Sequence, residues 1–189
     1  MLHACNEYFI HLAIFGDNQA GKSSLLLRFV EDNFNESVHL LEASCYRTIR
    51  SMRVKLSIKN AQLNKKQLPA SYYKPLDGIM VMYDITNWET FENLLFIYTN
   101  IKLFCEDNTK LYLVGNKNDG KRAVSKEDGQ RLARQLGIPF FEISSKNGCR
   151  VEELFSSLVS TVLDEKVPER TSHKNNKRST ATKIVKVCS

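Results

Sequence analysis

Short apolar runs alternate along the chain with segments in which apolar residues recur every three or four positions. Buried strands are typically brief runs rich in Val, Ile, Phe and Tyr. Runs of this kind predict strands at Tyr8–Phe15, Val54–Ile58, Ile79–Tyr83, Leu111–Val114 and Pro139–Ile143. Because strands that alternate with helices form a mostly parallel sheet with helices on both faces, the pattern predicts an α/β fold.

Helical periodicity is clearest in two apolar stripes, which we expect to be the faces that pack on the sheet. The first stripe is Phe91, Leu94, Leu95, Tyr98 and Ile101, and the second is Val151, Leu154, Phe155, Leu158, Val159 and Val162. A further helix is predicted where Ser125 is followed by Asp128, a spacing typical of a capping box. This helix should run to about Gln135, because Gly137 and Pro139 then end it.

The domain organisation follows from where this periodicity begins and ends. A chain of 189 residues, 42% hydrophobic, suits one globular domain, which we place at residues 8–163 after a short extension at 1–7. Residues 164–189 are expected to form a basic, disordered tail. From Arg170 to Ser189 there are six Lys or Arg residues and no acidic ones, and such a segment cannot supply a packed core.

Composition limits the cellular compartments and the classes of partner that fit this chain. The cysteines are odd in number and scattered, which predicts a reducing compartment and neither a disulfide framework nor a metal cluster: Cys5, Cys45, Cys105, Cys149 and Cys188. The sequence has no apolar run long enough to cross a bilayer and no signal-peptide profile, so we expect a cytoplasmic protein. A net charge of +6 is typical of a solvated surface, and we expect no nucleic-acid partner.

The segment after the first predicted strand carries a G-x-x-x-x-G-K-S pattern and opens a predicted helix. It consists of Gly16, Asp17, Asn18, Gln19, Ala20, Gly21, Lys22 and Ser23, with Ser24 next. Glycines let the backbone wrap an anion, amides at a helix N-terminus face phosphates, Lys22 adds positive charge, and Ser23 can ligate magnesium. The alternative is an ordinary glycine turn, against which the flanking strand and the apolar Leu25–Val30 both count. We therefore predict a phosphate-binding loop.

A phosphate loop alone leaves adenylate kinases, transport ATPases and GTPases open, so residues that read the base must decide among them. Asn116, Lys117, Asn118 and Asp119 follow a predicted strand and should project from the carboxyl edge of the sheet, where such folds bind ligands. Asp119 can accept from the ring N–H and the exocyclic amine of guanine, a donor pair that adenine lacks. An isolated N-K-x-D is usually a polar loop, but its position here predicts guanine binding.

Together these motifs resemble the Ras-like small GTPases, and within them the Rab branch. The resemblance covers roughly residues 8–163 and is carried by Gly16–Ser24, Arg28–Asp32, Tyr83–Asn87, Asn116–Asp119 and Ser144–Lys146. It implies a single P-loop NTPase domain, GTP or GDP with Mg²⁺ as cofactors, protein effectors and regulators as partners, and a role in vesicle traffic.

The resemblance also implies roles for individual residues around the base. Ser144, Ser145 and Lys146 form a loop that closes over the guanine, in which the N–H of Ser145 donates to the base oxygen. Lys117 and Lys146 pack beside the ring. Phe34 matches an aromatic residue that covers the base, and the alternative for this residue is a core or loop aromatic.

The segments that match the family's two switches depart from its pattern. The magnesium-ligating threonine of the first switch maps to Leu41, which cannot ligate a cation. In the second switch the acidic residue, the glycine and the water-positioning glutamine map to Asn60, Leu63 and Asn64. Gln62 lies two positions before the glutamine site and would need a different loop path to act there. We therefore assign no catalytic residue and expect a weakened magnesium site with Ser23 as its ligand.

Three functions stay open. The chain is a hydrolysis-competent GTPase switch, a nucleotide-holding pseudo-GTPase, or a scaffold that has lost nucleotide. The missing switch residues count against a hydrolysis-competent switch. The intact base-reading and phosphate-binding residues count against a scaffold that has lost nucleotide, so we favour the pseudo-GTPase. Hydrolysis should then be very slow or absent, and GTP and GDP should bind with similar affinity.

The tail raises a question of membrane contact. Six basic residues near an anionic leaflet would each contribute about 1 kcal/mol. Cys188 lies one residue from the end and matches neither the paired cysteines of Rab tails nor a Ras-type lipidation box. The tail therefore predicts either a peripheral position on the cytosolic face of an internal membrane or a solvated segment with an incidental thiol.

Overall fold

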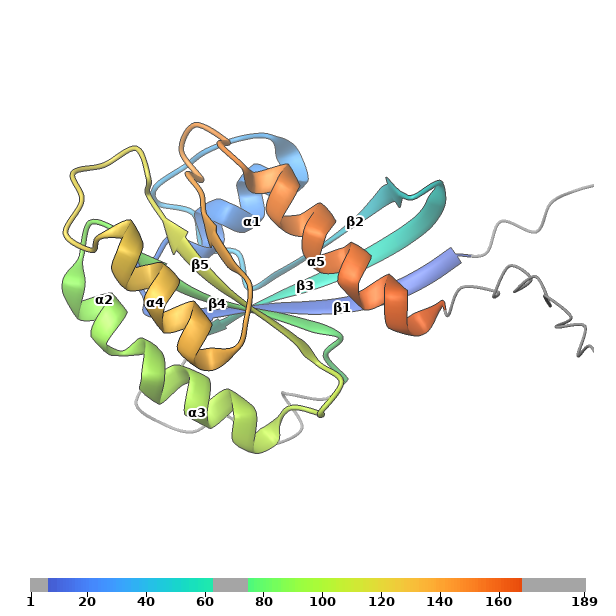
Figure 1. The fold of residues 1–189 in the computed structure, drawn as a ribbon. Coiled ribbons are helices and arrows are strands. Elements are labelled where there is room, and N and C mark those ends of the chain that lie inside the picture. Colours follow the sequence, from blue (N-terminus) through green and yellow to red (C-terminus); the bar gives the residue numbers. More distant parts are fainter. Residues whose placement is uncertain (1–6, 63–74, 168–189) are drawn as a thin grey trace, which may run out of the picture.

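The computed structural model of the protein describes residues 7–62 and 75–167. Its centre is a six-stranded sheet in the order β2-β3-β1-β4-β5-β6 (Figure 1). The strands are β1 (Glu7–Gly16), β2 (Glu42–Ile49), β3 (Met52–Gln62), β4 (Gly78–Asp84), β5 (Lys110–Asn116) and β6 (Phe140–Glu142). Every neighbouring pair is parallel except β2 with β3. The mostly parallel sheet predicted from the alternating pattern is confirmed.

Helices cover both faces of this sheet (Figure 1). They are α1 (Lys22–Glu31), α2 (Trp88–Glu92), α3 (Leu94–Phe104), α4 (Lys126–Leu136) and α5 (Val151–Lys166). One core cluster joins α1 and α5 to the sheet, and within it the rings of Phe29 and Phe155 stack with centroids 3.7 Å apart. The other cluster joins α3 and α4 to the opposite face. No helix in the described ranges is long and apolar enough to cross a membrane.

Helix α4 starts and ends where the sequence signals predicted. The Ser125 hydroxyl accepts the backbone N–H of Asp128 at 3.1 Å, which satisfies one of the amides left over at a helix N-terminus. Gly137 ends the helix with φ 67°, a left-handed conformation that glycine adopts without a steric penalty. The capping spacing therefore placed this helix to within a residue at each end.

β2 is a strand that the apolar runs did not predict. Its residues alternate between exposed and half-buried, and the inward row is Ala43, Cys45, Arg47 and Ile49. This row is too small and too polar to register as an apolar run. β2 is an edge strand that pairs only with β3 in the sheet order, so it needs less apolar surface than a central strand.

The first apolar stripe was assigned one wrong member. Leu95 is 55% exposed, whereas Ile97 is 4% exposed and takes the core position beside Leu94 and Ile101. The buried row runs through Thr90, Leu94, Ile97 and Ile101 at steps of three and four residues, and Leu95 lies one position beside this row. Phe91 packs instead through the edge-to-face contact of its ring with Tyr83, at 5.1 Å between centroids.

The first strand and the last helix lie close to the expected ends of the domain. β1 already includes Glu7, and α5 continues to Lys166, so the helix extends past the boundary expected after Leu163. Residues 1–6 and the tail from residue 168 onward, including Cys188, lie outside the described residues. Both described termini lie at the end of the molecule that carries the turn between β2 and β3 (Figure 1).

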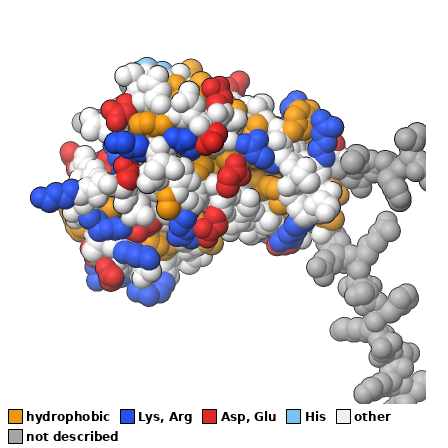
Figure 2. All heavy atoms as spheres, turned by 90° about the horizontal axis from the view of Figure 1, so that it is seen from above, with side chains coloured by type: hydrophobic (Ala, Val, Ile, Leu, Met, Phe, Trp, Pro, Cys, Tyr) orange, Lys and Arg blue, Asp and Glu red, His pale blue; other side chains and the backbone are white. Residues whose placement is uncertain are grey.

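Charged side chains on the face seen in Figure 2 are mixed in sign, with basic and acidic groups interspersed among hydrophobic ones. Ion pairs among the described residues include Arg150 with Glu153 at 2.7 Å and Lys166 with Asp77 at 2.7 Å. Pairs at such exposed positions contribute at most about 1 kcal/mol each. The sheet and its two cores therefore carry the fold.

Candidate functional site

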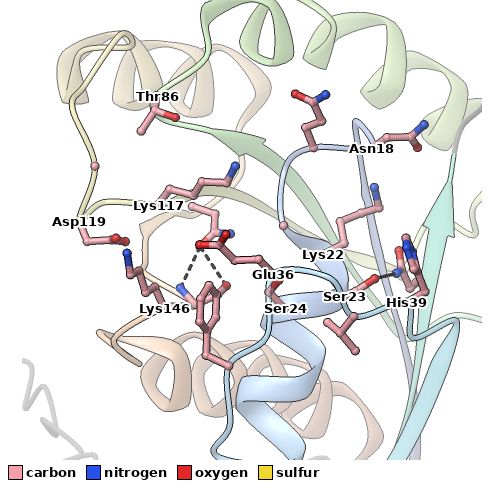
Figure 3. A pocket seen from close by; sticks show the side chains of 18 residues that line it. Asn18, Lys22, Ser23, Ser24, Glu36, His39, Thr86, Lys117, Asp119 and Lys146 are labelled. Atoms are coloured by element: carbon pink, nitrogen blue, oxygen red, sulfur yellow. Dashed lines mark hydrogen bonds between the residues drawn. The ribbon is translucent and has the colours of Figure 1, made fainter.

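One large cavity, of about 860 Å³, lies where the carboxyl ends of β1, β3, β4 and β5 meet the start of α1. Sequence-predicted residues from four separate segments line it: Asn18, Gln19, Gly21, Lys22, Ser23, Ser24, Phe34, Asn116, Lys117, Asp119, Ser145 and Lys146. Gly16, Ala20 and Ser144 do not line the cavity but are hydrogen-bonded to residues that do. Figure 3 shows Asp119, Lys117 and Lys146 around one end and Lys22 and Ser23 around the other.

The phosphate loop joins β1 to α1 and depends on its two glycines. A Cβ on Gly16 would lie 2.2 Å from the carbonyl oxygen of Met82 on the neighbouring strand, so a larger residue would push β1 and β4 apart. Gly21 has φ 86°, and a Cβ there would lie 2.5 Å from Nδ2 of Asn116. Only glycine therefore allows this backbone path, which is the one an enclosed anion needs.

Lys22 is buried at the floor of this loop and is 3% exposed. Its ammonium donates to the carbonyl oxygens of Gly16 at 2.8 Å and Asp17 at 2.6 Å, which fix its position beneath the cavity. Burial lowers the pKa of Lys22 from 10.5 to about 8, and the carboxylate of Asp17 partly opposes this shift. A phosphate in the cavity would supply the negative charge that the buried ammonium lacks.

Asn116 is the structural bridge between the phosphate loop and the base end. It is 1% exposed, and its Nδ2 donates to the carbonyl oxygen of Ala20 at 2.9 Å. Its Oδ1 accepts both the backbone N–H and the hydroxyl of Ser145, each at 3.0 Å, so the N–H that the resemblance assigns to the base oxygen is bonded to Asn116 in this structure. One side chain thereby fixes the distance between the loops that would hold phosphate and base.

The base end is organised around Asp119. The hydroxyl of Ser144 donates to Oδ1 of Asp119, so the carboxylate is oriented from behind. Lys117 has φ 64° and its ammonium lies 2.6 Å from the buried carboxylate of Asp84, which holds its aliphatic chain along the cavity. A fixed carboxylate beside a fixed aliphatic stem suits a flat ring that carries two N–H donors.

Arg122 supports this base end from outside the cavity, and Thr86 supports it from the cavity wall. Arg122 forms a bidentate ion pair with the buried carboxylate of Glu142, at 2.6 and 2.9 Å, and also donates to Oδ1 of Asn118 at 3.0 Å. The methyl group of Thr86 lies against Gly120, where a Cβ would approach it to 2.5 Å. The loop after β5 is therefore clamped to β6 and to the end of β4.

The loop between α1 and β2 contributes residues that sequence reasoning missed. Phe34 lines the cavity as expected and is half-buried, but Glu36, Val38 and His39 also line it. Thr86 and Gly120 complete the set from the other side. The loop residues have no periodicity to mark them, and the only available signal was their position between Phe34 and Leu41.

Leu41 and Asn60 sit where the resemblance places groups that serve magnesium. Leu41 is 70% exposed and does not line the cavity. Asn60 does line it and is 5% exposed, and its Nδ2 donates to the hydroxyl oxygen of Ser23 at 2.9 Å and to the carbonyl oxygen of Leu40 at 2.6 Å. The described residues hold no group of three or more His, Cys, Asp or Glu side chains suited to a metal. Of the residues that the resemblance assigns to magnesium and that the structure describes, Ser23 keeps a side-chain oxygen facing the cavity, whereas Asn60 presents an amide N–H and Leu41 lies outside it.

The segment that matches the second switch falls mainly outside the described ranges. Leu63 and Asn64 are among residues 63–74 and have no described position, and Gln62 is placed only as the last residue of β3. The sequence departures there stay predictions.

Comparison with known proteins agrees with this geometry. A model of the Ras family matches residues 11–164. Ras-related protein SEC4 of Candida albicans is 36% identical over 171 residues, covering 86% of this chain and 81% of the relative. Ras-related protein Rab-13 of Bos taurus is 35% identical over 185 residues, covering 94% and 91%, and GTP-binding protein ypt2 of Schizosaccharomyces pombe is 34% identical over 177 residues, covering 89% and 88%. The chain therefore belongs to the Ras family of small GTPases, on its Rab-like branch.

Proposed function

We propose that the protein binds GDP and GTP in the cavity between the phosphate loop and Asp119. The observation that carries this proposal is the joint geometry. An anion cradle with Lys22 lies at one end and the Asp119 carboxylate at the other, and Asn116 is hydrogen-bonded to Ala20 in the cradle and to Ser145 in the loop at the base end. The relatives called GTP-binding protein, ypt2 and Rab-3D, support the same ligand.

Base specificity tests this proposal. Replacing Asp119→Ala removes two charge-assisted hydrogen bonds to guanine, and we expect GDP affinity to fall about 100-fold, corresponding to about 3 kcal/mol. Asp107→Ala is the matched control, because Asp107 is exposed and does not line the cavity. Isothermal titration with GDP and ADP measures both variants. Equal affinity of the unmodified protein for GDP and ADP would refute the assignment.

We further propose that this chain holds nucleotide without hydrolysing it at a useful rate. Phosphoryl transfer relies on magnesium, on positive charge at the γ-phosphate and on an oriented water. Leu41 points its side chain to solvent, and Asn60 presents an amide N–H where a carboxylate would be needed. The same losses leave few groups that would distinguish GTP from GDP, so similar affinity for both should follow.

A single-turnover experiment with pre-loaded GTP tests the loss of hydrolysis. We expect the bound GTP to persist after an intact Rab protein, under the same conditions, has converted its own. Conversion at the Rab rate would establish a working GTPase switch and would point to Gln62 as the first candidate for the missing glutamine. A purified protein that binds no guanine nucleotide would instead favour a scaffold.

The cellular role is proposed on kinship. The Rab-like branch supports a part in vesicle traffic, with protein effectors and regulators, on the cytosolic face of an internal membrane. The basic tail and Cys188 would supply membrane contact, and one lipid chain would need the basic residues to anchor stably. Mass spectrometry of the cellular protein, together with binding to phosphatidylserine vesicles, tests this part. An unmodified Cys188 and no vesicle binding would remove it.

A further inference from the structure

Asn60 presents an N–H donor to the Ser23 hydroxyl oxygen, the atom that would ligate magnesium, whereas the acidic residue that the resemblance places here would present an acceptor. Nδ2 of Asn60 donates to the Ser23 hydroxyl oxygen at 2.9 Å and to the Leu40 carbonyl oxygen at 2.6 Å. The Leu40 carbonyl fixes which way the amide faces, because a rotated amide would place two acceptor oxygens against each other. The positive end of the amide dipole therefore points at Ser23.

This arrangement disfavours a cation at Ser23 for two reasons. The amide N–H occupies one lone pair of the hydroxyl oxygen and carries partial positive charge, whereas a carboxylate at this position would attract the ion. Magnesium also demands near-ideal octahedral geometry and is held in such sites by carboxylates and phosphates. Since Leu41 brings no oxygen from its side chain, Ser23 would be the cation's single ligand from these positions.

The same side chain frees Ser23 to act as a donor. Because its oxygen accepts from Asn60, its own proton must go to another acceptor, and a phosphate oxygen is the acceptor that the proposed ligand offers. Lys22 lies next to it in sequence and lines the same end of the cavity. Phosphate charge would then be met by an ammonium, a hydroxyl and the amides of the loop.

Asn60 also fixes the loop between α1 and β2. Its backbone N–H donates to the carbonyl oxygen of Leu41 at 2.7 Å, beside the side-chain bond to Leu40. One residue of β3 therefore holds two consecutive peptides of the loop and the first turn of α1. These hydrogen bonds hold the loop through groups of the protein itself. Oδ1 of Asn60 has no partner among the described residues and is open to a donor such as water.

We propose that Asn60 takes the place of magnesium in this pocket, so that nucleotide is retained without a divalent cation. This proposal depends on the guanine-nucleotide binding proposed above. Asn60 acts here as a positioning residue, through Ser23 and the loop at Leu40.

Release of a fluorescently labelled GDP in Mg²⁺ and in EDTA tests the proposal on the unmodified full chain. We expect the release rate to change by less than about twofold when the metal is removed. For comparison, mutating the residues that orient the ligands of a functional metal ordinarily lowers metal affinity or activity by about 10- to 100-fold. Acceleration of tenfold or more in EDTA would overturn the proposal while leaving nucleotide binding intact. No labelled GDP bound in either buffer would refute the proposed function itself.

Asn60→Asp should create the missing magnesium dependence. The carboxylate can accept from Ser23 and attract the cation once the Leu40 carbonyl has moved away from it, so Mg²⁺ should slow GDP release by at least about tenfold relative to EDTA. Asn35→Asp is the control with the same change of charge, because Asn35 is exposed, does not line the cavity, and keeps its acceptor for the Ser37 N–H, which it bonds at 2.8 Å. An Asn60→Asp protein whose release ignores Mg²⁺ would show that Asn60 does not set the metal requirement, and so would contradict the proposal.

Discussion

Asn116→Ala is the perturbation that most directly probes how the two halves of the pocket are held together. The variant loses three hydrogen bonds from a side chain that is 1% exposed: those to the Ala20 carbonyl, the Ser145 N–H and the Ser145 hydroxyl. At about 1 kcal/mol each, the free energy of unfolding should fall by about 3 kcal/mol. For a domain of this size the midpoint of thermal unfolding should fall by about 10 °C.

Urea and thermal unfolding, each with and without GDP, measure this loss. GDP should stabilise the variant much less than it stabilises the unmodified protein, because the phosphate and base loops are no longer tied to a common residue. Asn118→Ala is the matched control in the same loop: it is exposed and loses one bond, from Arg122 at 3.0 Å, so it should cost about 0.5 kcal/mol or less. A loss below about 1 kcal/mol for Asn116→Ala would refute the bridging role.

Two further predictions concern charge. Because the pKa of Lys22 is lowered to about 8 in the free protein, and a bound phosphate favours the charged form, GDP affinity should be flat below that pH and should fall as the pH rises above it; affinity that stays constant from about pH 7 to about pH 9 in equilibrium titrations would contradict this. Arg122→Ala leaves the buried Glu142 carboxylate without its bidentate partner and should lower the free energy of unfolding by about 2 kcal/mol in urea titrations, whereas Arg131→Ala, which removes an exposed pair, should have little effect.

The parts of the site that sequence could predict are those encoded by contiguous residues. Gly16 to Ser23 and Asn116 to Asp119 are short motifs that follow apolar strands, so their place at one edge of the sheet follows from the α/β pattern alone. The capping box at Ser125 is local in the same sense. Each of these features depends on neighbours within a few positions.

Features that depend on distant partners could not be read in this way. The sequence showed that Asn60 replaces an acidic residue. The direction in which its side-chain amide faces, however, is set by the Leu40 carbonyl, which belongs to the loop between α1 and β2. The role of Asn116 as a bridge requires the approach of Ala20 and Ser145 in space. β2 went unrecognised because its inward row, which includes Arg47, is stabilised by packing at the sheet edge, where the Arg47 guanidinium lies over the Phe29 ring.

The nucleotide that stays with the protein through purification tests the central claim most directly. The protein is denatured and the released small molecules are separated by chromatography and identified by mass. GDP or GTP in an amount equal to that of the protein is the expected result, because the phosphate loop and Asp119 line one cavity. Adenine nucleotide in that amount, or failure of the emptied protein to take up added GDP, would contradict the account.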